Sequence, residues 1–289
     1  DVRRIYLRES NFARLCVKAG KRENFAEDAE VTLKRAFARI CSINSLAWIK
    51  FLQRFFDNPA PTDINDMTQN EKRMLLMFHY TIWHKLPEEC GFADAAESLE
   101  TLKLCPVMLH ELTELLAYLA DKIDFVGRQI DLGYDCPLEL HCSYTKDQIL
   151  LAFDHKNPAS VREGVKYLPD KKTDLLWMTL NKSAKDYSPS TMYDDYSINA
   201  ELFHWQSQST TAETSVMGQR YISHANTGNK ILLFVREYKK DAAETAPYTY
   251  MGPVQYLKHE GSKPMNVTWK LENEIPAKYL KKTNKLGVA

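Results

Sequence analysis

The hydrophobic period of the sequence changes near Gly133 and Pro137, and this change constrains the fold more than any other feature. Before it, apolar residues recur every three or four positions, the spacing of one helix face. After it, short runs rich in β-branched and aromatic residues alternate with turn residues, as is typical of strands. We therefore predict an α+β chain, with a helical N-terminal region at residues 1–136 followed by an antiparallel β-rich barrel or sheet domain at 137–289.

Individual elements can be placed within both regions. Apolar stripes predict helices around residues 25–40, 46–56, 71–82, 92–102 and 106–123. The third of these helices begins with a capping box made by Thr68 and Glu71, and Pro106 opens the last. Strands are predicted at 175–180, 202–208, 221–224, 231–238, 248–257 and 267–271. A hairpin turn is expected at 226–229, and a bend or bulge at Gly252.

Bulk composition limits where such a chain works. Hydrophobic residues make up 44% and charged residues 26%, and no apolar run reaches the length of about 20 residues needed to span a bilayer. No leader-like segment opens the sequence. Six cysteines without a C-x-x-C pair are typical of reduced thiols. These features predict a cytoplasmic protein without membrane contact.

The distribution of charge is uneven along the chain. The formal net charge is zero, which argues against a histone-like polycation. Residues 1–54 nevertheless carry twelve Lys/Arg against six Asp/Glu, a local excess of six positive charges. Local stripes of this kind matter more for nucleic-acid binding than the total does. The same residues also fit an ordinary solvated helix face.

The densest cluster of potential ligand-binding side chains lies between residues 187 and 208. A strand points its side chains alternately to its two faces, so His204, Gln206 and Gln208 share one face at intervals of about 6.5–7 Å. An imidazole and two carboxamides in a row can donate and accept hydrogen bonds at base edges. The row is also what the wet face of an ordinary half-exposed strand presents, and both interpretations stay open.

Aromatic and basic side chains complete the candidate site. Tyr193, Tyr196 and Trp205 are candidates for stacking on bases. Lys182, Arg220 and Arg236 are candidates for holding phosphates. The predicted nucleic-acid-binding residues are therefore His204, Gln206, Gln208, Trp205, Tyr193, Tyr196, Lys182, Arg220 and Arg236.

Catalytic motifs are weak in this sequence. Asp194, Asp195, Glu201 and Lys182 supply the residue types of a metal-dependent nuclease, but the strand that follows reads H-W-Q-S-Q instead of (D/E)-x-K. No Walker loop, G-x-G-x-x-G or G-x-S-x-G motif occurs. We expect no catalytic residues, no cofactor, no metal and no enzyme activity in this chain.

Seven stretches in the second region carry a resemblance to a known family. They are P-L-E-L-H-C-S-Y-T-K-D-Q-I-L (137–150), T-L-N-K-S (179–183), S-P-S-T-M-Y-D-D-Y-S-I-N (188–199), L-F-H-W-Q-S-Q (202–208), I-L-L-F-V-R-E (231–237), Y-T-Y-M-G (248–252) and K-P-M-N-V-T-W-K-L (263–271). The region resembles the uncharacterised domain that follows superfamily II helicase cores in bacterial proteins, often with a phospholipase-D-like nuclease at the N-terminus. The helical region is similar to the segment that joins the helicase core to that domain. The closing strands also look like those of PUA- and SRA-like barrels, which include readers of modified DNA bases.

Three functional hypotheses follow. The first is a DNA-binding accessory module that directs a tethered helicase or nuclease in DNA processing or anti-phage defence, with modified and single-stranded DNA as candidate ligands. The second is a protein-interaction module that docks onto the helicase core or a phage-encoded trigger, which predicts an exposed apolar patch on the helical half. The third is a cryptic metal-dependent nuclease. DNA and the tethered helicase and nuclease domains are the expected partners.

Overall fold

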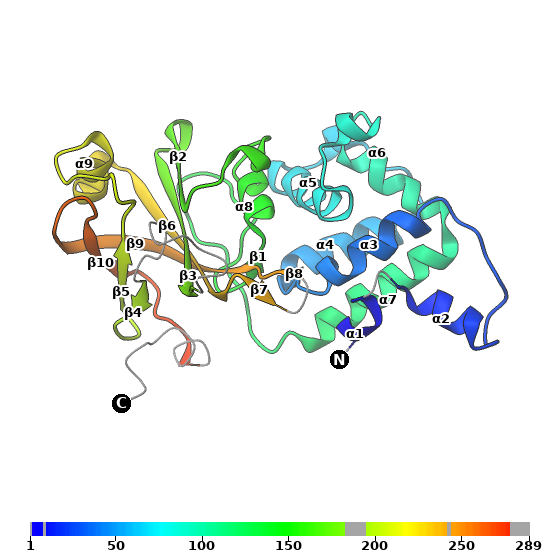
Figure 1. Ribbon diagram of the computed structural model, residues 1–289. Helices are drawn as coiled ribbons and strands as arrows, with labels where there is room; N and C mark the ends of the chain where they lie inside the picture. The colour runs from blue at the N-terminus through cyan, green and yellow to red at the C-terminus, as the bar shows by residue number, and fades with distance from the viewer. Residues whose placement is uncertain (1, 8–9, 183–194, 242–243, 278–289) are drawn as a thin grey trace. The chain divides into compact units, whose positions relative to one another are not determined.

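The structure, a computed structural model, describes residues 2–7, 10–182, 195–241 and 244–277. The chain forms two compact units, Asp1–Ser160 and Val161–Ala289, so the predicted boundary at residues 136 and 137 lies within the first unit. The predicted α+β class is confirmed, because helices dominate the first unit and the second is built on a mixed β-sheet (Figure 1).

The first unit consists mainly of helices that bury one apolar face each. They are α1 (Arg3–Tyr6), α2 (Phe12–Lys18), α3 (Glu30–Ile40), α4 (Leu46–Asp57), α5 (Gln69–Trp83), α6 (Ala95–Glu100), α7 (Pro106–Lys122) and α8 (Lys146–Ala152), with the short strand β1 (Ser143–Tyr144) before α8. The predicted capping box is present, since Thr68 and Glu71 bond each other's backbone at the start of α5. None of the described helices combines the length and the apolar character needed to cross a membrane.

Three glutamates from distant parts of the sequence stabilise helix N-termini in this unit. Glu27 accepts hydrogen bonds from the first amides of α7, and Glu111 accepts from the first amides of α2. Glu139 accepts from Ser45 Oγ at 2.6 Å and from the amide of Ala47 in α4. A carboxylate suits this place because the first amides of a helix have no partner within it and carry partial positive charge.

The second unit is organised around one open sheet. Its strands are β2 (Val165–Leu168), β3 (Thr173–Asn181), β4 (Tyr196–Ser197), β5 (Leu202–Gln206), β6 (Lys230–Tyr238), β9 (Tyr248–Glu260) and β10 (Asn266–Leu271). They lie in the order β2-β3-β6-β9-β10-β5-β4, and β7 (Lys240–Asp241) and β8 (Glu244–Thr245) form a separate hairpin. Of the two predicted alternatives, the sheet is right and the barrel is wrong, because β2 and β4 remain at opposite edges.

One strand pair departs from the predicted antiparallel arrangement. Strand β3 runs parallel to β6, whereas the pairs β2–β3, β6–β9, β9–β10, β10–β5 and β5–β4 are antiparallel. Parallel neighbours need a long crossover, and the chain provides one that passes through β4, β5 and two helices before it returns. The expected bulge is confirmed at Gly252, where φ is 84° and the β6–β9 register shifts.

The predicted strand at residues 221–224 and the predicted hairpin turn at 226–229 are wrong. Residues Val216–Ile222 form helix α9, which begins where the Ser215 side chain accepts a hydrogen bond from the Gly218 amide. His224–Thr227 form α10, which ends at Gly228 with φ of 69°. The serine cap decides for a helix, and the glycine supplies a left-handed helix end instead of a hairpin turn.

An aromatic cluster fills the core beneath β5 and β10. Trp205, Trp269 and Tyr221 pack with ring centroids 5.3–6.2 Å apart, so α9 covers this face of the sheet. Trp269 is completely buried. Aromatic groups of this size dominate the burial energy of a core, so this cluster fixes which face of β5 and β10 points inward.

A buried ion pair joins β3 to α9. Asp174, 1% exposed, accepts two hydrogen bonds from the Arg220 guanidinium at 2.7 and 2.8 Å. It also accepts one from the Asn229 side chain at 2.9 Å. Such a carboxylate is satisfied only while all its donors stay in place, so the pair ties α9 and the start of β6 to β3.

Replacing Asp174 with alanine is expected to lower the free energy of unfolding by about 3–5 kcal/mol, because the Arg220 charge then loses its buried partner. Chemical denaturation measures this loss. Asp170→Ala removes an exposed aspartate nearby and is expected to stay within about 0.5 kcal/mol of the parent protein. Equal effects of the two changes would show that the buried pair is not a stabilising element.

A buried histidine gives the first unit a pH-dependent stability. His79 on α5 is completely buried, contacts Ser98 Oγ through Nδ1 at 2.7 Å and stacks on Trp83. Burial lowers the pKa of His79 to about 4, below the value of about 6.5 for an exposed imidazole. The folded state therefore holds this imidazole neutral, whereas the unfolded state takes up a proton between these two values.

The contribution of His79 to stability is expected to be complete above about pH 6.5 and to be lost as the pH falls toward about 4. His79→Phe keeps an aromatic ring and removes the titration. The unfolding temperature of this variant should therefore fall less than that of the parent between pH 7 and pH 4.5. Identical pH profiles of the two proteins would contradict the buried neutral imidazole.

Candidate nucleic-acid interface

Strand β5 has the alternation that the sequence predicts. Phe203 and Trp205 are buried in the core, whereas His204 and Gln206 on the other face are partly exposed. The strand ends at Gln206, so Gln208 lies beyond it and is also partly exposed. The imidazole and the carboxamides of the predicted row thus all retain solvent contact.

Strands β10 and β9 extend this row across the sheet. In the antiparallel register, Thr268 lies opposite His204 on one side and opposite Lys258 on the other. Asn266 lies opposite Gln206 in the same way. Directly opposed residues share a face of a sheet. We use the name polar face for the amide, imidazole, hydroxyl and ammonium side chains on this side: His204, Gln206, Gln255, Lys258, Asn266, Thr268 and Lys270. Leu202, opposite Lys270, and the exposed carboxylate of Glu260, opposite Asn266, lie on the same side.

The residues contributed by β10 were missed by sequence reasoning. The strand reads N-V-T-W-K-L, and Val267, Trp269 and Leu271 are buried. The alternation was therefore visible, and it would have placed Asn266, Thr268 and Lys270 together on the opposite face. What the pattern could not give is that β10 lies beside β5.

Contacts between neighbouring strands order the polar face. The imidazole of His204 stacks on the Tyr196 ring of β4, with centroids 4.6 Å apart and planes 12° from parallel. The Gln206 amide donates to the Asn266 side-chain oxygen at 3.1 Å. Thr268 between these pairs is only 6% exposed. On β9 and β10, Lys258 and Lys270 add exposed cations to the polar face.

The buried carboxylate of Asp195, directly before β4, contacts both Lys182 and β5. Lys182 Nζ lies 2.7 Å from one carboxylate oxygen of Asp195, and both side chains are less than 10% exposed. The other carboxylate oxygen accepts a hydrogen bond from the backbone N–H of Gln206 at 3.0 Å. Burial raises the pKa of Asp195, and the Lys182 ammonium opposes that rise. Both oxygens of this aspartate, one of the residue types considered for a nuclease, therefore contact other groups of the protein.

Two arginines predicted to hold phosphates bond within the fold. Arg220 forms the pair with Asp174, and its guanidinium lies 3.9 Å from the centre of the Tyr167 ring. Arg236 donates to Thr179 Oγ1 at 2.9 Å and packs over the ring of Tyr248. Along with Lys182, these cations have partners inside the protein.

The three predicted stacking residues have different positions. Tyr196 is partly exposed at the edge of the polar face. Trp205 is only 4% exposed and belongs to the core, so it has no open ring face for a base. Tyr193 lies outside the described residues. Among the described residues, Tyr196 is therefore the one of these three rings that lies beside the polar face, opposite His204.

Nothing in the described part of the chain resembles a metal centre. No group of three or more His, Cys, Asp or Glu side chains is arranged there to hold an ion.

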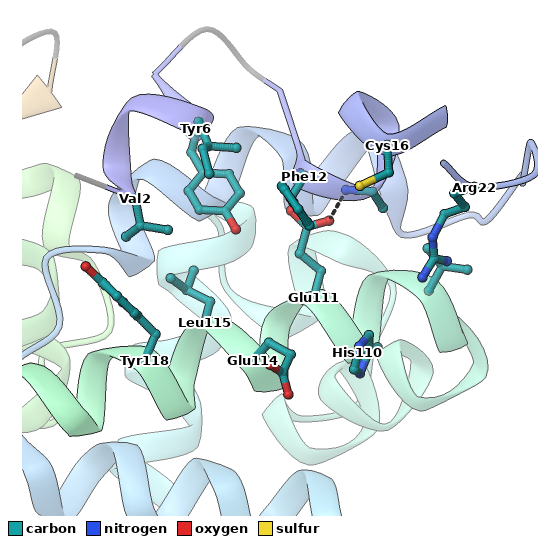
Figure 2. Close-up of a pocket in the computed structure, with 13 residues that line it drawn as sticks. Val2, Tyr6, Phe12, Cys16, Arg22, His110, Glu111, Glu114, Leu115 and Tyr118 are labelled. Atoms are coloured by element: carbon teal, nitrogen blue, oxygen red, sulfur yellow. Dashed lines mark hydrogen bonds between the residues drawn. The ribbon is translucent and has the colours of Figure 1, made fainter. Parts of the chain in front are cut away.

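The first unit contains a separate groove along α7, which we call the α7 groove. It has a volume of about 360 Å³, and Figure 2 shows its walls, formed by α1, α2 and one face of α7. At its floor, Glu111 accepts the amide hydrogen bonds of α2 beside the Tyr6 ring. Phe12 and Tyr118 line the groove and are 55% and 39% exposed. Glu114 and Arg22 add charges of opposite sign.

Comparison with known proteins places the second half of the chain in a family. No curated protein matches the chain. A family model described as "Domain of unknown function (DUF3427)" matches residues 138–282, which is half of the sequence. The match begins one residue after the start of the predicted C-terminal region and includes every strand of the open sheet and the whole polar face. The chain belongs to the DUF3427 family of domains of unknown function.

Proposed function

We propose that this protein is a DNA-binding module that contacts DNA through the polar face. The observation that carries the proposal is the continuous array of hydrogen-bonding side chains across β5, β10 and β9. Amides and an imidazole can match base edges, and the exposed lysines beside them can attract phosphates. The hydrophobic core of the second unit lies on the other face of these strands.

The roles of individual residues differ from the sequence-based assignment. Gln206, Gln208 and Asn266 would contact base edges in this proposal, whereas the His204 ring, which stacks on Tyr196, would contact the flat face of a base. Phosphates would be bound by Lys258 and Lys270 instead of Lys182, Arg220 and Arg236, because those three cations are held in internal contacts. Lys270 has no partner among the described residues, and the ion pair of Lys258 with Glu260 is long at 3.6 Å and exposed. Both ammonium groups can therefore be neutralised by DNA at little expense to the fold.

The biological setting of the proposal rests on the resemblance of residues 137–289 to the domain that follows bacterial superfamily II helicase cores. In that setting the chain acts as an accessory module in DNA processing or anti-phage defence. Binding by the polar face would deliver DNA to the tethered helicase and nuclease domains. The chain itself would work by recognition, without chemistry of its own.

The 289-residue chain is expected to bind DNA with an affinity that falls steeply as salt rises, because phosphate contacts release counterions. Lys258→Gln combined with Lys270→Gln should weaken binding about tenfold or more at low salt and reduce the salt slope by about two. Fluorescence anisotropy across a salt series measures both quantities.

Lys172→Gln is the matched control for this prediction. It removes an exposed lysine at the start of β3, far from β5 in the strand order, and should change binding little. Absence of binding to any DNA at low salt would remove the proposal. Equal effects of the control and the double variant would place the DNA elsewhere on the protein.

The α7 groove favours a second candidate function, protein docking. It is apolar in its walls and has aromatic side chains at its rim, as an interaction site on the helical half requires. A helix laid along α7 could contact residues from Val107 to Tyr118, about 16 Å of helix length. The partner in this proposal is a helical segment of the helicase core.

Phe12→Asp is expected to reduce co-purification of the chain with a separately expressed helicase core, because it places a charge at the rim of the α7 groove. Leu257→Asp introduces the same charge at an exposed leucine of the second unit and should leave co-purification unchanged. Equal recovery of the core with both variants would exclude docking through this groove.

A further inference from the structure

The polar face has an aromatic pair at its outer edge. Tyr196 lies opposite His204 in the β4–β5 register, and their rings stack almost in parallel. Strand β4 is the last strand of the sheet, so the pair stands where the sheet ends. Both residues are partly exposed. A planar base gains affinity by stacking on such rings, whatever its sequence.

Hydrogen-bonding and charged groups lie close enough to this pair of rings to contact the same nucleotide. Asn266 and Lys270 are two positions before and after Thr268, the residue directly opposite His204. Diagonal neighbours of this kind are about 7–8 Å apart in an antiparallel pair. A carboxamide therefore lies on one side of the rings and a cation on the other, both on the same face of the sheet.

The buried ion pair makes the ring pair a fixed platform. Asp195 directly precedes Tyr196, and its carboxylate bonds both Lys182 and the backbone of Gln206. These contacts attach the edge strand at two points to neighbouring segments. A ring pair that is already ordered loses little further entropy when a base stacks on it, which favours binding.

We propose that the polar face binds single-stranded DNA, with one unpaired base stacked on the Tyr196–His204 pair. The Gln206 and Asn266 carboxamides contact the edge of that base, and Lys270 binds an adjacent phosphate. This inference rests on the proposed DNA-binding function and names its substrate class. In a duplex each base is paired and stacked between neighbours, so its flat faces and its pairing edge are out of reach of a sheet.

Competition between strand forms tests the inference. The full chain is titrated into a labelled single strand of about 12 nucleotides, within the usual range of site sizes, and into its blunt duplex at the same salt. Binding of the single strand is expected to be at least about tenfold tighter. Tyr196→Leu should weaken single-strand binding by about fivefold or more, as loss of one base stack does, and leave duplex binding unchanged.

Matched variants separate stacking from loss of fold. Tyr196→Phe keeps the ring and should retain single-strand binding. Tyr238→Leu removes an exposed tyrosine at the end of β6 and should leave both affinities unchanged. Should Tyr196→Leu not fold, the parent protein still gives an answer, because a strand containing 2-aminopurine is expected to lose fluorescence on saturation when that base stacks.

The outcomes distinguish the inference from the proposal beneath it. The single-strand assignment is overturned if the duplex binds as tightly as the single strand, or if Tyr196→Leu weakens binding of both forms equally. Either result is still compatible with DNA binding by the polar face. Unchanged 2-aminopurine fluorescence at saturation overturns base stacking. No binding of either form removes DNA binding itself.

Discussion

Burial of the Trp205 and Trp269 side chains is the constraint on which the rest of the second unit depends. Both rings pack with Tyr221 on one face of the sheet, so β5 and β10 have a single register that satisfies the core. A slip of one residue would turn each tryptophan to the opposite side. The polar face is the necessary consequence of this burial, because every second residue of each strand must then point away from the core.

Charge pairs inside the fold explain why the phosphate-binding residues could not be identified by counting Lys and Arg along the sequence. Lys182, Arg220 and Arg236 are prominent in the sequence, but each has a partner within the fold, 13, 46 and 57 residues away along the chain. The lysines left at the surface of the polar face are less conspicuous in the sequence and better placed. In the first unit, glutamates serve a similar internal role, because Glu27, Glu111 and Glu139 accept hydrogen bonds from backbone amides at helix N-termini.

Local signals in the sequence were sufficient for much of the fold. Periodicity placed the main helices and most strands, and the capping box at Thr68 was read correctly, because each depends on residues a few positions apart. The strand predicted at residues 221–224 was wrong, because four residues of β-prone type are too few to outweigh a serine helix cap at Ser215. The parallel pairing of β3 with β6 was not predicted, because it joins segments more than fifty residues apart in the sequence.

The candidate site was predictable within one strand and not beyond it. Alternation placed His204 and Gln206 on one face of β5, whereas their partners Thr268 and Asn266 come from a strand about sixty residues later. The solvent exposure of the candidate aromatic residues could not be predicted from the sequence either. Tyr196 and Trp205 were equivalent stacking candidates there, and only packing separates the partly exposed ring from the buried one.

Amide hydrogen exchange with and without DNA tests the location of the interface most directly. If the polar face binds DNA, saturation should slow exchange in β4, β5 and the Asn266–Leu271 strand, with little change in β3 or in the helices of the first unit. Protection confined to those helices, with β5 and β10 unaltered, would contradict this account.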